Sequence, residues 1–162
     1  MSVQKVRNYL EAWQLHSRVR EFPVSSATVE AAAAAVDCEP GRIAKTMSFW
    51  INKQPVLIVL AGDAKISNPL FKAVFHQKAT MIPPEKVEEH TGFAPGGVCP
   101  FALPAGLTVY LDESLKRFPI VYPAGGNGQS AVELSLQELW DASRAKAWVC
   151  VSALPKPVEV FP

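Results

Sequence analysis

Lys45 and a glycine-rich loop are the residues of this chain whose types and spacing could do chemistry. Lys45 stands in "RIAKTMSF", at the head of the apolar face of a predicted strand. Gly96 and Gly97 lie in "GFAPGGVCP", between prolines that stiffen the loop. Glycine backbone can present successive N–H groups to an anion or to the oxyanion of a tetrahedral intermediate. Together they predict a cleft in which one cation and backbone donors hold a compact ligand.

A second glycine loop, "PAGGNGQSAVEL", contains Gly125, Gly126, Asn127 and Ser130. Each loop lies in a stretch without charged residues, 91–111 for the first and 118–132 for the second. The first stretch is long enough to cross a membrane, but its three prolines would break a helix there, and we predict no membrane span. The alternative interpretation is plain: both loops are tight turns, and Lys45 extends its ammonium to a solvent-exposed rim.

Other catalytic patterns are absent from the sequence. It contains no P-loop, GxGxxG, HExxH or GxSxG motif, and its three histidines are isolated from one another. Cys99, in the first glycine loop, is a candidate nucleophile, but without a neighbouring base we expect it to be a thiol that lines the pocket. The three cysteines suit free thiols in a reducing cytoplasm, and no spacing predicts a metal or another cofactor.

Composition limits the partners. The 162 residues predict one domain, 1–162, that ends in an extended tail, 154–162. Sixteen basic and fifteen acidic side chains give a net charge of +1, which argues against DNA and against any broad nucleic-acid footprint. The N-terminus lacks an apolar signal core, so we expect a cytoplasmic protein.

Hydrophobic periodicity predicts the elements that position these residues. Helices are expected over 3–13, 25–37, 68–77, 83–92 and 135–145, and strands over 18–22, 44–51, 55–61, 78–82, 107–111, 119–123, 130–135 and 146–152. Ser25 or Ser26, Asn68 and Ser135 are the expected helix caps. Asp63 and Asp112 each follow a strand, where we expect turn caps rather than catalytic acids. The fold class is α/β of the α+β type, a mixed sheet with helices outside it.

These motifs in this order resemble the YbaK-like aminoacyl-tRNA deacylases, which are related to the editing domain of bacterial prolyl-tRNA synthetase. The resemblance covers residues 3–153. It is carried by "SSATVEAAA", "RIAKTMSF", "AGDAKISN", the pattern G-x-x-x-G-G-x-x-P at Gly92, Gly96, Gly97 and Pro100, and "GG...AVEL" after Ala124. It implies a partly barrel-like sheet and a free-standing hydrolase that cleaves the ester of a mischarged tRNA, often tRNA(Pro) carrying a small wrong amino acid. A synthetase is an implied partner.

The resemblance also implies roles for residues. The functional lysine of the family is matched by Lys45, which we expect to hold a phosphate of the terminal adenosine. The N–H groups of Gly96, Gly97 and Val98 would hold the ester carbonyl, and a ribose hydroxyl would orient the water. The expected substrate-binding residues are Phe93, Val98, Cys99, Pro100, Gly125, Gly126, Asn127 and Ser130. Phe93 departs from the family, where a polar ring is frequent. The alternatives are a non-catalytic module that binds aminoacyl or nucleotide ends or a partner protein, and a hydrolase that uses Cys99.

Overall fold

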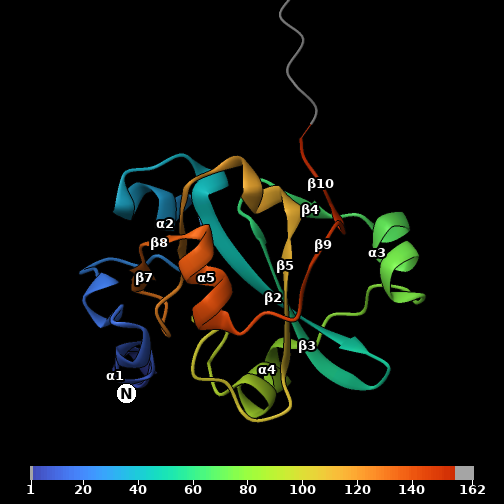
Figure 1. Ribbon diagram of the computed structural model, residues 1–162, viewed down its shortest axis with the longest axis horizontal. Helices are drawn as coiled ribbons and strands as arrows, with labels where there is room; N and C mark the ends of the chain where they lie inside the picture. Colours follow the sequence, from blue (N-terminus) through green and yellow to red (C-terminus); the bar gives the residue numbers. More distant parts are fainter. Residues whose placement is uncertain (1, 156–162) are drawn as a thin grey trace, which may run out of the picture.

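A curled, mixed six-stranded sheet forms the centre of the computed structural model, which describes residues 2–155 (Figure 1). Its strand order is β8-β6-β2-β3-β5-β9. The strands are β2 (Ile43–Ile51), β3 (Gln54–Ala61), β5 (Thr108–Asp112), β6 (Ile120–Pro123), β8 (Leu134–Ser135) and β9 (Ala147–Val149). Two small antiparallel pairs join β1 (Val19–Glu21) to β7 (Ser130–Val132) and β4 (Lys65–Ile66) to β10 (Ser152–Ala153). The predicted fold class is confirmed; residues 156–162 of the predicted tail lie outside the described residues.

The hairpin of β2 and β3 is the longest pairing in the sheet, with register from Ala44 opposite Ala61 to Ile51 opposite Gln54. Its two-residue turn places Asn52 and Lys53 in the left-handed region, at φ 51° and 63°, as the twist of a tight hairpin requires. β3 is the apolar run "PVLIVLA", and its side chains from Leu57 to Ala61 are fully buried. The strands predicted over 44–51 and 55–61 are therefore confirmed, and they pair as a hairpin.

Within residues 2–155, five α-helices lie around the sheet. They are α1 (Ser2–Leu10), α2 (Val29–Val36), α3 (Asn68–Phe75), α4 (Pro84–Thr91) and α5 (Leu136–Ser143). In Figure 1, α1 and β7 lie on one side of the sheet and α3 on the opposite side. Short 3-10 helices occur at Glu11–Trp13, His16–Arg18, Pro40–Arg42 and Glu113–Arg117. No helix of the described residues is long and apolar enough to span a membrane, and residues 92–107 form the connection from α4 to β5.

Two predicted helix caps are wrong. The α2 cap is Thr28, whose hydroxyl accepts from the N–H of Ala31, and the α3 cap is Ser67, whose hydroxyl accepts from Leu70. In both cases the capping side chain directly precedes the first helical residue, whereas the predicted residues lie outside that position or one place inside the helix. The Ser135–Glu138 capping box of α5 is confirmed.

The predicted strand over 78–82 is also wrong, because this segment makes only an isolated bridge between Met81 and Phe49. Pro83 and Pro84 follow at once and end any further pairing, since proline has no N–H to donate. The N–H of Ile82 still donates to Ser48 O at 3.0 Å. Residues 80–82 therefore contact only the C-terminal part of β2, on the edge that faces away from β3.

Candidate active site

A cavity of about 580 Å³ opens beside β2. Its wall is mostly apolar and comes from four regions: α2 with the residues before it, β2, the 81–87 segment, and the two glycine loops with β6. Of the residues predicted from sequence, Lys45, Gly96, Val98 and Ser130 line it. The other lining residues on which the argument depends are Thr46, Met47, Met81, Val87 and Pro95.

The cavity lies where β2 has no neighbour. β6 pairs with β2 only at Ile43 and Ala44, and the next partner on that edge is Ile82 at Ser48. A residue of a β-strand directs its N–H and C=O to the same side, and successive residues alternate. Because Ser48 and Trp50 direct theirs away from β3, the N–H and C=O of Thr46 also point outward, into the gap. Among residues 2–155, the Thr46 hydroxyl is the one buried side-chain polar atom without a hydrogen-bond partner.

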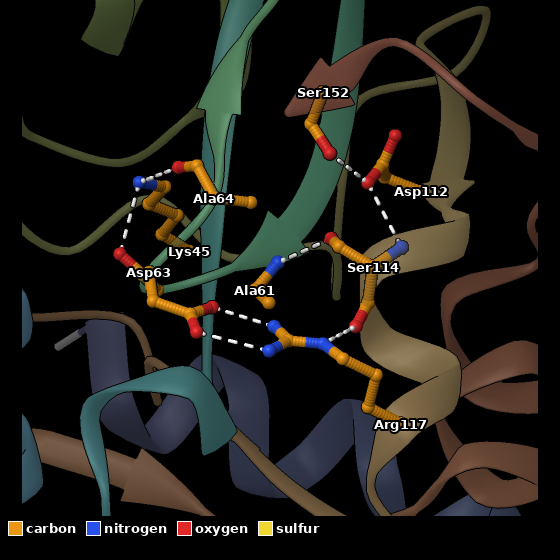
Figure 2. Close-up of polar contacts among 9 residues, drawn as sticks. Lys45, Ala61, Asp63, Ala64, Asp112, Ser114, Arg117 and Ser152 are labelled. Carbon is orange, nitrogen blue, oxygen red and sulfur yellow. Dashed lines mark hydrogen bonds and ion pairs between the residues drawn. The ribbon is translucent and has the colours of Figure 1, made fainter. Parts of the chain in front are cut away.

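Lys45 is fixed at the cavity wall by main-chain carbonyls (Figure 2). Its Nζ donates to Gly62 O at 3.1 Å and to Ala64 O at 2.6 Å. Partial burial lowers the pKa of the Lys45 ammonium below its ordinary value, and the nearby Asp63 carboxylate works against that shift. An ammonium has three donors, so these two bonds leave one N–H for a ligand.

The first glycine loop offers fewer donors than the sequence predicted. The N–H of Gly97 donates to Ala94 O at 3.0 Å and so closes a turn, which removes it from the expected carbonyl-binding set. Gly96 adopts φ 90°, a conformation that favours glycine. No partner within residues 2–155 takes the N–H of Gly96 or of Val98, and both residues line the cavity.

The two glycine loops pack against each other. A Cβ on Gly97 would lie 2.6 Å from the Cα of Asn127 and 2.8 Å from Gly126 O. Gly126, at φ 111°, lies against Ser2 O of α1, where a Cβ would be 2.7 Å away. Gly97 and Gly126 therefore allow close approach of main chains, and neither lines the cavity.

The hydroxyl of Ser130 holds the second glycine loop in place. It accepts from the N–H of Gly125 at 3.0 Å and donates to Asn127 O at 3.2 Å. Asn127 in turn accepts from Gln129 N through its side chain at 2.8 Å. Of the second-loop residues expected to bind substrate, Gly125, Gly126 and Asn127 thus lie outside the cavity lining, and Ser130 reaches it with its hydroxyl already bonded.

Phe93, Cys99 and Pro100 lie behind the cavity. Phe93 and Cys99 are buried in the main hydrophobic cluster, and Pro100 is buried beside them. Lys5 of α1 covers Phe93, with its Nζ 4.1 Å from the ring centroid, and donates to Gly92 O at 3.1 Å. These side chains support the loop from its inner side and do not touch the space a ligand would occupy.

Replacing Cys99 with alanine is expected to leave unchanged the ester hydrolysis that the family resemblance implies. The thiol is fully buried, and burial raises its pKa to about 12, so it is protonated at neutral pH and a poor nucleophile. The smaller side chain should lower the free energy of unfolding by about 1 to 2 kcal/mol. Single-turnover deacylation well below the melting temperature is the measurement, with Cys150→Ala, an exposed thiol, as the matched control. A rate that falls to background would restore the thiol mechanism.

Sequence reasoning missed part of the site. The sequence places Thr46 only within the predicted strand 44–51. It divides the 81–87 segment, which brings Met81 and Val87 to the cavity, between a predicted strand and a predicted helix and gives neither a role. Thr46 is adjacent to Lys45 in the sequence, so its position next to the predicted functional lysine could have marked it as a candidate site residue. Met81 and Val87 come from segments whose place beside β2 depends on tertiary structure.

Both Asp63 and Asp112 were expected to be turn caps, and the structure shows this role for Asp112. Asp112 caps the 3-10 helix Glu113–Arg117 by accepting from Ser114 N, as expected of a turn cap. Asp63 instead forms a bidentate ion pair with Arg117 at 2.5 and 3.0 Å. Within residues 2–155, no three His, Cys, Asp or Glu side chains cluster as metal ligands.

Comparison with known proteins identifies the family. A family model described as the aminoacyl-tRNA editing domain matches residues 24–142. The uncharacterized protein YwhH of Bacillus subtilis is 47% identical over 152 residues, which is 93% of this chain and 97% of that protein. Proline–tRNA ligase of Aquifex aeolicus is 32% identical over 90 residues, which is 54% of this chain and 16% of the ligase.

The fold agrees with that assignment. The crystal structure of a protein proposed to be a trans-editing enzyme for prolyl-tRNA synthetase superimposes with a TM-score of 0.84, at 31% sequence identity, covering 94% of this chain and 97% of that one. With its curled sheet, Lys45 and the paired glycine loops, this chain belongs to the YbaK-like aminoacyl-tRNA editing domain family.

Proposed function

We propose that this protein is a free-standing deacylase that hydrolyses the ester of a mischarged tRNA, tRNA(Pro) carrying a small wrong amino acid. The observation that carries the proposal is Lys45, held by two carbonyls at the wall of a mostly apolar cavity that Gly96 and Val98 also line. The family and the ligase relative support the editing role and the link to tRNA(Pro).

In the proposed mechanism, little work is left for a protein base. An aminoacyl ester is already activated, so positioning a water and stabilising the developing oxyanion supply much of the rate. The remaining N–H of Lys45 binds a phosphate of the terminal adenosine. The N–H groups of Gly96 and Val98 bind the ester carbonyl, and a ribose hydroxyl of the substrate orients the water.

Thr46 provides polar contacts at the gap in the sheet. Its unpartnered hydroxyl and outward C=O are acceptors, and the α-ammonium of an aminoacyl group is the part of the substrate that needs acceptors. We therefore assign this edge of β2 to the amino group. Met47, Val87 and Val98 then surround the side chain, where a methylene more or less changes binding by only about 1 to 3 kcal/mol.

Thr46→Val tests that assignment. Valine keeps the shape and removes a hydroxyl that has no partner in the protein, so the free energy of unfolding should stay the same or rise by up to about 1 kcal/mol. The deacylation rate should fall by roughly tenfold, because the α-ammonium loses one acceptor of about 1.4 kcal/mol. Chemical denaturation and single-turnover hydrolysis are measured in parallel. Destabilisation with an unchanged rate would show that the hydroxyl is structural.

The function itself is tested with a panel of mischarged tRNAs, including alanyl-, cysteinyl- and seryl-tRNA(Pro), with prolyl-tRNA(Pro) as the cognate control. We expect hydrolysis of a small-residue ester and sparing of the cognate one. The near-neutral net charge predicts a shallow dependence of binding on salt, since few phosphates are contacted. Tight binding without turnover of any member would favour the non-catalytic module instead.

A further inference from the structure

The turn at residues 61–64 carries the two carbonyls that bind Lys45, and it also carries Asp63, whose side chain points the other way. Figure 2 shows the Asp63 carboxylate directed to Arg117, with the Lys45 ammonium on the opposite side of the turn. The guanidinium of Arg117 binds both carboxylate oxygens, at 2.5 and 3.0 Å. The 61–64 turn thus lies between the Lys45 ammonium and the Arg117 guanidinium, and the Asp63 carboxylate binds the guanidinium.

The turn is tightly placed. The N–H of Ala64 donates to Ala61 O at 3.0 Å, and a Cβ on Gly62 would lie 2.2 Å from Pro40 O. The Ser114 hydroxyl accepts from the N–H of Ala61 at 3.0 Å, and its carbonyl accepts from Nε of Arg117 at 2.9 Å. The turn and Arg117 are therefore attached to the same residue, so the ion pair spans two fixed points.

Asp112 makes that attachment rigid. It is buried, and its carboxylate accepts from Ser114 N at 3.0 Å, from Val151 N at 2.9 Å and from the Ser152 hydroxyl at 2.6 Å. These bonds fasten the start of the 3-10 helix that carries Arg117 to the β10 end of the chain. Arg117 accordingly presents its guanidinium from a supported position.

The Asp63–Arg117 ion pair affects the electrostatic environment of Lys45. Asp63 lies close enough to Lys45 to act on its charge, and the hydrogen bonds from Arg117 hold the pKa of the Asp63 carboxyl below its ordinary value. The other charged groups that act on Lys45 are Glu30 and Lys65. A guanidinium matches a carboxylate with two parallel bonds, whereas an ammonium is a point charge, so Arg117 is the better partner for Asp63. Besides Arg117, Lys45 is the cation that acts on the charge of that carboxylate.

We propose that Arg117 is a positioning residue for the reaction: by occupying the Asp63 carboxylate, it keeps the Lys45 ammonium on Gly62 O and Ala64 O, with its remaining donor free for the substrate. The proposal rests on the proposed function of Lys45. The ion pair itself contributes little to stability, because both side chains are about one-third exposed, at 34% and 30%.

The test compares Arg117→Gln, Asp63→Asn and the double variant. Arg117→Gln should lower kcat for deacylation by about tenfold or more, because the unpaired carboxylate draws the ammonium out of its position. Removing that carboxylate as well should restore most of the rate, so the double variant should be faster than Arg117→Gln alone. A double variant as slow as Arg117→Gln, or an Arg117→Gln variant at the wild-type rate, overturns the proposal.

A second measurement does not depend on turnover. Titration of the Lys45 side chain, followed by ¹⁵N and ¹³C resonances of isotopically labelled lysine, reports its pKa in each variant. An unpaired carboxylate favours the charged ammonium, so Arg117→Gln should raise the pKa of Lys45, and Asp63→Asn should lower it. An unchanged pKa in both variants overturns the proposal even if no aminoacyl-tRNA is hydrolysed. Failure of the wild-type protein on every mischarged tRNA would instead remove the proposed function while this titration still decides the geometry.

The matched control is Arg18→Gln. Arg18 forms a bidentate pair with Glu138 at 3.0 and 3.1 Å, with comparable exposure of 39% and 29%, and neither residue lines the cavity. Loss of this pair should leave both kcat and the pKa of Lys45 unchanged. An equal fall in kcat for Arg18→Gln would mean that any lost ion pair has this effect, which would overturn a specific role for Arg117.

Discussion

Lys45→Ala is expected to reduce the rate of aminoacyl-tRNA hydrolysis by at least about a hundredfold, the scale of losing one preorganised electrostatic contact to the reacting group. The truncated side chain removes the Lys45 ammonium from the cavity wall. It also leaves Gly62 O and Ala64 O without their donor. Since both carbonyls belong to a tightly packed turn, the turn should persist and the fold should remain intact. The loss should therefore appear in kcat/KM and not in the folded fraction.

Single-turnover hydrolysis of the best mischarged tRNA from the panel measures the effect, with circular dichroism of the same samples as the check on folding. Lys65→Ala is the matched control, because Lys65 is an exposed lysine that acts on the charge of Lys45 without lining the cavity. We expect it to retain nearly the full rate. Lys45→Arg should recover little, since a planar fork does not reproduce the two carbonyl contacts of an ammonium. Full activity of Lys45→Ala would contradict the proposed mechanism.

Much of the fold was readable because its signals are local. The alternation of residues 44–51, the continuous apolar run of β3 and the Ser135–Glu138 box each specify an element within a few positions. Predictions failed where several residues compete for one role. Thr28, Ser25 and Ser26 can all cap a helix, but only Thr28 directly precedes the first helical residue and accepts from Ala31 N. Residues 78–82 have the composition of a strand, but they find only one bridge on β2.

The candidate site likewise contains residues that the sequence could predict and contacts that it could not. Lys45 and Gly96 were recognisable from residue type and spacing, and Val98 was expected from the family resemblance; all three line the cavity. The contact of Gly97 with Asn127 joins positions 30 residues apart, and the Asp63–Arg117 pair joins positions 54 apart. Neither of these two contacts is marked by a local pattern in the sequence. A glycine required for close approach of two main chains has the same one-letter code as a glycine that presents an N–H to a ligand, so the sequence could not separate these roles.

Gly97→Ala separates them experimentally. The added Cβ would lie 2.6 Å from the Cα of Asn127 and 2.9 Å from its N, and both are main-chain atoms that cannot rotate away. Relief requires the two glycine loops to move apart, which should lower the free energy of unfolding by about 2 to 3 kcal/mol. For a chain of this size, that corresponds to a melting temperature lower by roughly 4 to 12 °C. Thermal unfolding followed by circular dichroism measures it.

The same substitution should also slow hydrolysis at temperatures where the variant is fully folded, because Gly96 and Val98 flank the displaced residue and line the cavity. Gly128→Ala is the matched control in the facing loop: its Cβ would meet the Ala27 Cβ at 3.3 Å, and small shifts of a few tenths of an ångström relieve that contact. We expect it to lose less than about 1 kcal/mol and to keep most of its activity. If Gly97→Ala instead melts like the wild type and its activity still falls, the glycine acts on the ligand directly and the packing explanation is wrong; a wild-type melting temperature with wild-type activity would show that the loops are less tightly apposed than these distances require.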